Sequence, residues 1–218
     1  NVNLKWVDTT AIDPNSVTRH LRDAHAIIVP GGFGVRGTEG KIECIRHARE
    51  NKIPYLGLCL GFQMAVIEFA RNVVGIRDAN STEFDPRCKN PVIDILPEQK
   101  LIEGLGGNMR LGGKDVEIKP DTLASRLFDG KPQIRLRFRH RYEVDPRYIE
   151  TLEKAGMLFS GRHPVHPIMQ ILELNKDVHP YFVGTQAHPC LTSRPLRPHP
   201  MFRGLVEARF DEIWPSSG

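Results

Sequence analysis

A cysteine between two glycines is the clearest chemical signal in the sequence. Residues 57–61 read Gly-Leu-Cys-Leu-Gly, follow an apolar run at residues 54–58 and precede residues with helical spacing. A strand, a tight turn and a helix in this order form a nucleophile elbow, which holds the central side chain out at the carboxyl end of a sheet. A helix N-terminus also lowers the pKa of a thiol placed on it. We therefore predict that Cys59 is a nucleophile with a lowered pKa; the alternative is a buried structural cysteine.

A thiol that forms an acyl-enzyme needs a proton carrier, and the sequence offers His188. This histidine follows the apolar run at residues 181–186. Because the carboxyl ends of parallel strands meet at one edge of a sheet, Cys59 and His188 can meet there despite their separation in sequence. The other eight of the nine histidines carry no comparable signal.

The glycine-rich loop at residues 30–34 (Pro-Gly-Gly-Phe-Gly) follows another apolar run, at residues 26–29. Its backbone N–H groups are suited to a developing oxyanion, because glycine lets the backbone approach closely. A phosphate cradle or a plain turn are the alternatives. The loop matches neither the Walker pattern nor the dinucleotide fingerprint, which argues against a nucleotide site.

Two further features have competing interpretations. Arginines at 135, 137 and 139 alternate with apolar residues, which predicts a strand with one basic face. That face could bind an anionic ligand or nucleic acid, or could be a solvated sheet edge whose charges prevent pairing with another strand. Cys59, His188 and Cys190 are acceptable zinc ligands, but paired ligand spacings are absent. We expect neither a metal nor nucleic acid.

The elements that must position these residues follow an α/β rhythm, in which glycine and proline punctuate short apolar runs. We predict a mostly parallel central sheet with helices on both faces. The predicted strands lie at residues 4–7, 26–29, 54–58, 133–144, 158–160, 169–174 and 181–186, and the predicted helices at 15–23, 38–51, 60–70, 148–155 and 201–208.

Composition limits the class of protein. The chain has 218 residues, 40% of them hydrophobic and 26% charged, and a formal net charge of +4. This composition argues against a disordered tail, and no apolar run approaches the roughly 20 residues of a membrane span. Four cysteines are too few for a disulfide scaffold and favour a reducing compartment. The chain starts without Met, and we expect one domain, residues 1–218, cut from a longer protein.

The motifs together resemble a known family. The sequence is similar to class I (triad) glutamine amidotransferases, of flavodoxin-like fold, and among these to the C-terminal domains of CTP synthases. The segments that carry the resemblance are residues 29–34, 54–63, 80–84, 109–112, 139–144, 186–189 and 193–195.

The resemblance implies hydrolysis of L-glutamine to glutamate and ammonia. Cys59 would attack the side-chain amide to give a thioester, and His188 would protonate the departing ammonia and then activate water. The Gly32 and Leu60 backbone N–H groups would hold the oxyanion. The residues that would hold the glutamine are Gln63, Glu83, suited to the α-ammonium, and Arg141, suited to the α-carboxylate.

The resemblance also implies a longer enzyme. A synthase domain of the same polypeptide, absent here, would use the ammonia to aminate UTP activated by ATP, making the whole protein a glutamine-hydrolysing ligase of pyrimidine biosynthesis. ATP, Mg and activating GTP are implied for that enzyme, and no cofactor for this domain. A cytoplasmic homotetramer, with no membrane association, is the implied assembly.

The sequence departs from the family at the third member of the triad. Cys190 stands where the family has Glu, and a thiol is a poor substitute for the carboxylate that orients the histidine. Phe62 and Phe138 replace a common Met and His, which leaves the named roles intact. Two hypotheses follow: an active glutaminase domain, or a glutaminase-like binding or regulatory module with impaired catalysis. Cys44 and Cys88 have no assigned role.

Overall fold

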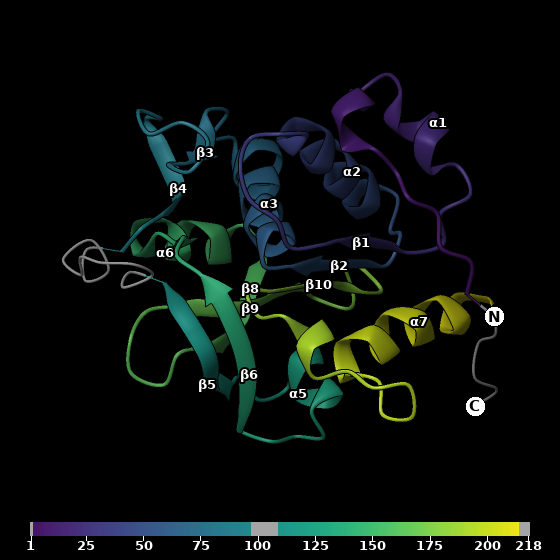
Figure 1. The fold of residues 1–218 in the computed structure, drawn as a ribbon, viewed down its shortest axis with the longest axis vertical. Helices are drawn as coiled ribbons and strands as arrows, with labels where there is room; N and C mark the ends of the chain where they lie inside the picture. Colours follow the sequence, from purple (N-terminus) through teal and green to yellow (C-terminus); the bar gives the residue numbers. More distant parts are fainter. Residues whose placement is uncertain (1, 97–108, 214–218) are drawn as a thin grey trace.

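The computed structural model describes residues 2–96 and 109–213 (Figure 1). Among these residues the centre of the molecule is a seven-stranded sheet with the order β1-β2-β10-β9-β8-β5-β6. Its strands in chain order are β1 (Ile27–Val29), β2 (Tyr55–Leu58), β5 (Arg110–Ile118), β6 (Gln133–His140), β8 (Met157–Arg162), β9 (Met169–Leu174) and β10 (Phe182–Thr185).

The sheet is mixed rather than mostly parallel. β1, β2 and β10 pair in parallel, whereas β10-β9, β9-β8, β8-β5 and β5-β6 all pair antiparallel. The prediction of a mostly parallel sheet is therefore wrong for the half that lies beyond β10. The reason is the connections: a long helical crossover joins β1 to β2, but a short link joins β8 to β9, which only antiparallel strands permit.

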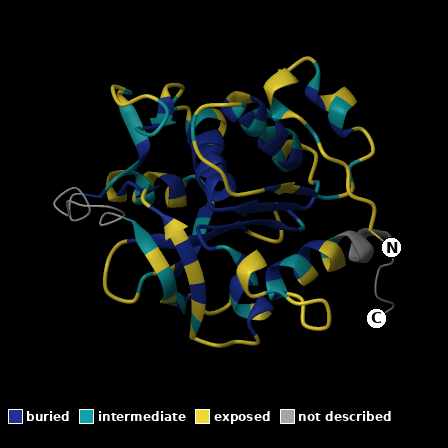
Figure 2. Ribbon diagram, viewed as in Figure 1, coloured by how far each residue is buried: buried dark blue, intermediate teal, exposed yellow. Residues whose placement is uncertain are grey.

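Helices cover both faces of the sheet, as predicted (Figure 1). On one face lie α1 (Val17–Leu21), α2 (Thr38–Glu50) and α3 (Leu60–Phe69), and on the other α5 (Leu123–Leu127) and α7 (Pro200–Ile213). Every residue of α3 is buried, and Figure 2 shows this helix and the parallel strands as the centre of the core. The α/β class is confirmed.

The remaining elements surround this core. A smaller sheet of three strands has the order β3 (Ala79–Ser81), β4 (Asn90–Asp94) and β7 (Glu143–Val144). The helix α6 (Pro146–Lys154) begins at an Asp145 cap, as its sequence leads one to expect. Three short helical turns complete the described chain: η1 (Thr9–Ala11), η2 (Ala70–Val74) and η3 (Pro189–Leu191).

One predicted strand is wrong. Residues 4–7 form no strand, and the Trp6 side chain is 89% exposed. Their apolar residues satisfied the pattern of a strand, but no neighbouring strand pairs with them. The sequence also missed β3, β4, β5 and the short helix α5. The three strands contain glycine, proline, polar and charged residues that obscure the alternation of a strand.

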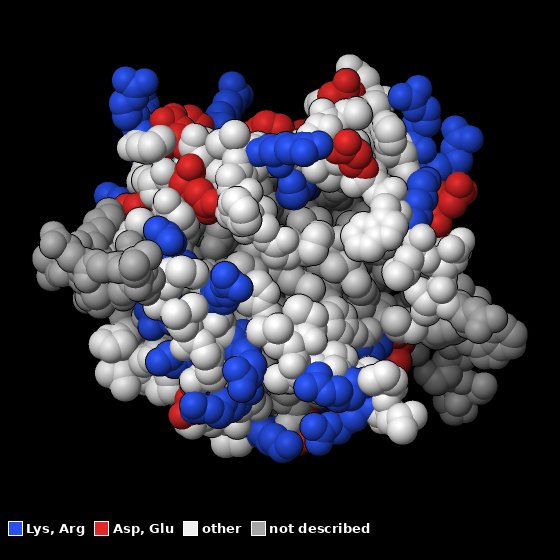
Figure 3. All heavy atoms as spheres, viewed as in Figure 1, with Lys and Arg blue, Asp and Glu red and all other residues white. Residues whose placement is uncertain are grey.

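The arginine-bearing strand β6 is the edge of the large sheet, and its residues alternate between exposed and buried (Figure 2). Its exposed arginines contribute to the basic surface over β5 and β6 (Figure 3), and Arg135 pairs with Asp115 of β5 at 2.9 Å. This position fits a sheet edge blunted by charge. In the described part of the chain, no helix is long and apolar enough to cross a membrane.

Candidate active site

The nucleophile elbow predicted from the sequence is confirmed. Cys59 stands between β2 and the first residue of α3 with φ 50° and ψ −97°, a backbone conformation that is uncommon for a residue with a side chain. Its N–H donates to the Thr185 carbonyl of β10 at 2.8 Å. The turn is therefore fixed to the carboxyl ends of two neighbouring parallel strands.

Close packing explains both glycines of the elbow. A Cβ on Gly61 would lie 2.1 Å from the Val29 carbonyl oxygen of β1. A Cβ on Gly57 would lie 2.5 Å from the Tyr55 hydroxyl, which donates to the Gly61 carbonyl at 2.9 Å. The start of α3 thus lies directly against β1 and β2, closer than any side chain would allow.

In the structure, Cys59 and His188 lie beside the same glycine, Gly31. A Cβ on Gly31 would lie 3.1 Å from His188 Cε1 and 3.5 Å from Cys59 Cβ. In the same loop, a Cβ on Gly32 would lie 3.2 Å from the Leu60 side chain. The two backbone segments assigned to the oxyanion, at Gly32 and Leu60, are therefore neighbours beside the thiol.

The thiol of Cys59 is not acidic. Burial raises the pKa of Cys59 to about 11, because removal from water disfavours the thiolate. Hydrogen bonds from the Leu60 N–H and the Gln186 side-chain amide lower the pKa, and the Glu83 and Glu143 carboxylates raise it. The prediction of a lowered pKa is therefore wrong: desolvation outweighs the helix N-terminus, and Cys59 is a neutral thiol near pH 7.

His188 is a neutral base beside this thiol. Burial lowers the pKa of its imidazole, while a hydrogen bond to the Arg139 backbone carbonyl raises it, and interactions with His140 and Arg139 lower it further. Its Nε2 is buried and has no hydrogen-bond partner among the described residues. The backbone is held in place, since the His188 N–H donates to the Arg137 carbonyl at 2.8 Å.

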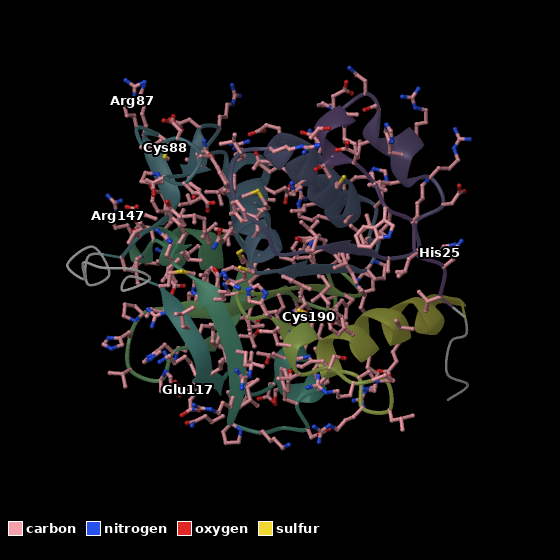
Figure 4. All side chains as sticks on the ribbon, viewed as in Figure 1. His25, Arg87, Cys88, Glu117, Arg147 and Cys190 are labelled. Atoms are coloured by element: carbon pink, nitrogen blue, oxygen red, sulfur yellow. The ribbon has the colours of Figure 1, made fainter. Side chains whose placement is uncertain are left out.

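Cys190 is exposed on η3, which leads toward α7 (Figure 4). Within residues 2–96 and 109–208, no carboxylate forms a hydrogen bond or ion pair with His188, and none affects its pKa. The described structure therefore supplies no substitute for the absent triad acid. Nor do three His, Cys, Asp or Glu side chains gather there as a metal site would require.

Two residues of opposite charge lie beside Tyr142. Glu83 raises the pKa of the Tyr142 hydroxyl and Arg141 lowers it, both less strongly than burial, which raises it. The Glu83 carboxylate accepts a hydrogen bond from the Gly34 N–H at 2.8 Å, which ties it to the glycine-rich loop. Arg141 is exposed and pairs with no acid of the described residues.

Gln63 is buried, with 3% of its surface exposed, and its amide nitrogen is used inside the protein. Its Nε2 donates to the Tyr142 carbonyl at 3.1 Å and to Gln186 Oε1 at 3.1 Å. The side-chain oxygen of Gln63 accepts no hydrogen bond from the described residues. This oxygen, rather than the nitrogen, is the atom available to a ligand.

Gln186 was missed by the sequence analysis. It is wholly buried, and its Nε2 donates to Cys59 Sγ at 3.5 Å. The available signal was its position directly after β10 and two residues before His188. An amide at the end of an apolar strand has many structural roles, so this position alone did not indicate contact with the thiol.

Two of the residues that depart from the family, Phe62 and Phe138, lie in the core. Phe62 and Phe138 are 0% and 2% exposed, and Phe138 packs edge-on against His140 with ring centroids 5.7 Å apart. Cys44 is buried in α2, and burial raises its pKa to about 11. Cys88 lies beside β3 and β4 (Figure 4), and no contact with the site assigns it a role.

Comparison with known proteins identifies the family of this chain. Residues 1–208 match the family model described as glutamine amidotransferase class-I. The chain belongs to the class I glutamine amidotransferases. Among solved structures, this amidotransferase is similar to the Trypanosoma brucei CTPS glutaminase domain with bound acivicin, with a TM-score of 0.88 and 33% identity. That likeness covers 97% of this chain and 81% of the other.

Curated relatives of this amidotransferase are longer proteins. It is 56% identical over 208 residues to a CTP synthase of Haloarcula marismortui, and 53% identical over 212 residues to one of Thermus thermophilus. Each match covers 95% of this chain but only 37% and 38% of the relative. The chain therefore spans less than two fifths of the length of these relatives.

Proposed function

We propose that this domain hydrolyses L-glutamine to glutamate and ammonia through a thioester on Cys59. The observation that carries the proposal is that a Cβ built on Gly31 would meet both His188 and Cys59, beside the neighbouring segments of Gly32 and Leu60. A nucleophile, a base and two backbone donors together are the parts of an acyl-transfer site.

Acylation begins with a neutral thiol and a neutral imidazole. His188 takes the proton of Cys59 as the sulfur attacks the side-chain carbonyl carbon of glutamine. The oxyanion that forms accepts hydrogen bonds from the Gly32 and Leu60 N–H groups. His188 then gives its proton to the departing nitrogen, the C–N bond breaks, and ammonia leaves a γ-glutamyl thioester on Cys59.

Deacylation uses the same groups in reverse. His188, again neutral, takes a proton from water as the water oxygen attacks the thioester carbon. The C–S bond breaks, the sulfur recovers the proton from His188, and the product leaves as glutamic acid, which gives its γ-carboxyl proton to the solvent and becomes glutamate. Each proton taken by His188 is thus returned within the same half-reaction, and the cycle needs no external acid.

The charges of the site fit an amino acid zwitterion. Glu83 and Arg141 both act on Tyr142, so the two charges lie near one side chain. We assign the α-ammonium of glutamine to Glu83 and its α-carboxylate to Arg141, because each then meets a group of opposite charge. We assign the Gln63 oxygen the role of accepting a hydrogen bond from the substrate.

The ammonia serves, in our proposal, a synthase domain of the same polypeptide that aminates UTP to CTP. The similarity to CTP synthases, of which the chain spans 37% and 38%, supports this role. Residues 1–218 are then one domain of a longer cytoplasmic homotetramer that binds neither nucleic acid nor a membrane.

The glycine-rich loop of this chain does not fit the nucleotides of the longer enzyme. The loop at residues 30–34 lacks the Walker pattern, and its Gly34 N–H donates to the Glu83 carboxylate rather than remaining open to a phosphate. We therefore assign ATP, Mg and the activator GTP to the whole enzyme and derive no step through them here.

Labelling with acivicin, an electrophilic glutamine analogue, tests the glutaminase proposal. We expect one covalent adduct, located at Cys59 by peptide mass spectrometry, and ammonia release from glutamine that the Cys59→Ala variant lacks. Cys44 is the internal control, because burial gives it a pKa of about 11 like that of Cys59. Modification at Cys59 but not Cys44 separates recognition of a glutamine-like ligand from general thiol reactivity.

An absence of labelling and of ammonia release, under conditions that label an intact CTP synthase, would refute the proposal. The domain would then be a glutaminase-like binding or regulatory module whose catalysis was lost with the triad acid. Binding of glutamine without turnover, measured by calorimetry, would identify that outcome.

A further inference from the structure

A chain of hydrogen bonds reaches the sulfur of Cys59, which itself faces the Arg139 carbonyl at 4.0 Å. The Tyr142 backbone carbonyl accepts from Gln63 Nε2 at 3.1 Å, and the same nitrogen donates to Gln186 Oε1 at 3.1 Å. Gln186 Nε2 then donates to Cys59 Sγ at 3.5 Å. The two glutamine side chains are 3% and 0% exposed, so water does not compete for these bonds.

The donor and acceptor roles along this series of hydrogen bonds are fixed by the Tyr142 carbonyl. A backbone carbonyl can only accept, so the group of Gln63 that faces Tyr142 must be its NH₂. The two N–H groups of that nitrogen are used by Tyr142 and by Gln186, and the atom of Gln186 that faces Gln63 must therefore be its oxygen. The NH₂ group of Gln186 is left to face the sulfur of Cys59.

We propose that Gln186 is a further catalytic residue, whose amide N–H stabilises the thiolate of Cys59 as the thiol proton leaves. A neutral thiol is a weak acceptor, whereas a thiolate accepts strongly, so the hydrogen bond favours the charged form. Gln63 acts through Gln186 as a positioning residue. The proposal rests on the glutaminase function, in which Cys59 is the nucleophile.

The need for this donor follows from the surroundings of the thiol. Burial and the carboxylates Glu83 and Glu143 disfavour the thiolate, and the triad acid that would stabilise protonated His188 is absent. The donors that face the sulfur are the Leu60 N–H and the Gln186 amide. Of these two, only the Gln186 amide belongs to a side chain, and substitution can therefore remove it.

Two substitutions at Gln186 test the proposal by alkylation of Cys59 with iodoacetamide between about pH 7 and 9, below the thiol pKa. Gln186→Met keeps the length of the side chain and removes the donor; we expect alkylation to slow about tenfold, as loss of one charge-assisted hydrogen bond predicts. Gln186→Glu places a negative charge beside the sulfur, and we expect it to be slower still.

Glutamine kinetics give a second readout. Gln186 contacts the sulfur and Gln63, but neither Glu83 nor Arg141, which hold the charged ends of the substrate. We therefore expect kcat to fall about tenfold in Gln186→Met while KM changes less than about twofold. A purely structural role for the amide would not separate kcat from KM in this way. Nor would a purely structural role make alkylation of Cys59 slower in Gln186→Glu than in Gln186→Met.

The matched control is Gln170→Met. Gln170 is a wholly buried glutamine on the neighbouring strand β9, and its amide has no hydrogen-bond partner in the described residues. Its replacement removes a buried amide without touching the sulfur, and we expect wild-type alkylation of Cys59. Thermal unfolding of each variant checks that it folds. If Gln186→Met does not fold, Gln186→Glu alone tests the proposal, because its carboxylate still accepts the hydrogen bond from Gln63.

Alkylation of Cys59 at the wild-type rate in a folded Gln186→Met or Gln186→Glu variant would overturn the proposal. Slowing by the same factor in Gln170→Met would overturn it as well. These results differ from failure of the glutaminase function, in which the wild-type protein itself neither reacts with acivicin nor releases ammonia.

Discussion

Restoring the missing acid is the most informative perturbation of this site. Cys190 is exposed two residues after His188, and no described carboxylate contacts that histidine. The substitution Cys190→Glu places a carboxylate at the position where the family has one. We expect glutaminase turnover to rise, because the carboxylate stabilises the imidazolium that forms when His188 takes the thiol proton.

The size of the gain follows from the exposure of position 190. A hydrogen bond to a charged group is worth about 1.5–3 kcal/mol, or about 10–100-fold in rate. Since Cys190 is exposed, solvent screens the new charge, and we expect the lower end, about a tenfold increase in kcat.

The pH dependence of kcat/KM in Cys190→Glu gives an independent test. A neighbouring negative charge raises the pKa of His188, whereas burial lowers it in the wild-type protein. Because His188 must be neutral to accept the proton, the acid limb of kcat/KM should move to higher pH. The gain in turnover is therefore largest above the raised pKa and shrinks on acidification.

Ammonia release measured from about pH 5 to 9 tests both expectations. Cys190→Gln is the matched control, since it has the length of Glu without the charge and should leave the acid limb in place. An unchanged kcat together with an unchanged acid limb in Cys190→Glu would refute the reasoning. The Arg139 carbonyl would then be sufficient to orient His188.

Two further predictions concern the elbow and the base. Gly61→Ala should lower the free energy of unfolding by about 3 kcal/mol or more in denaturant titrations, because its Cβ would lie 2.1 Å from a backbone oxygen. The control is Gly130→Ala, at a glycine with φ +70° and open space around it, which should cost only about 1 kcal/mol. Equal costs for the two substitutions would contradict the packing argument. Wild-type kcat/KM should show an acid limb with an apparent pKa below 6.5, since burial lowers the pKa of His188; a limb above about 7.5 would instead indicate a thiolate–imidazolium pair.

The local geometry of the elbow was predictable from the sequence. An apolar run, two glycines around a cysteine and a helical pattern specify a strand, a tight turn and a helix, and these appear as β2, Cys59 and α3. All of this pattern lies in one continuous segment, residues 54–70, in which local sterics decide the backbone. The roles assigned to the site residues remain predictions.

The direction of the outer strands and the pKa of the thiol were not predictable in the same way. Apolar runs identified β9 and β10 but not whether they pair in parallel, which depends on the connection between them. The helix N-terminus predicted an acidic thiol at Cys59, yet burial raises its pKa to about 11. Both errors come from applying a local rule to a property, strand direction or thiol pKa, that residues distant in the sequence determine.

The sequence by itself therefore determined the α/β class, the elbow and the family, because these depend on patterns that a short segment carries in full. Only the tertiary structure decided what surrounds the sulfur. Gln63, Gln186 and Tyr142 come from three separate segments, and their hydrogen bonds exist only once α3, β10 and the turn after β6 are packed together. Burial and hydrogen bonding are properties of that packing, and they set the charge state of Cys59.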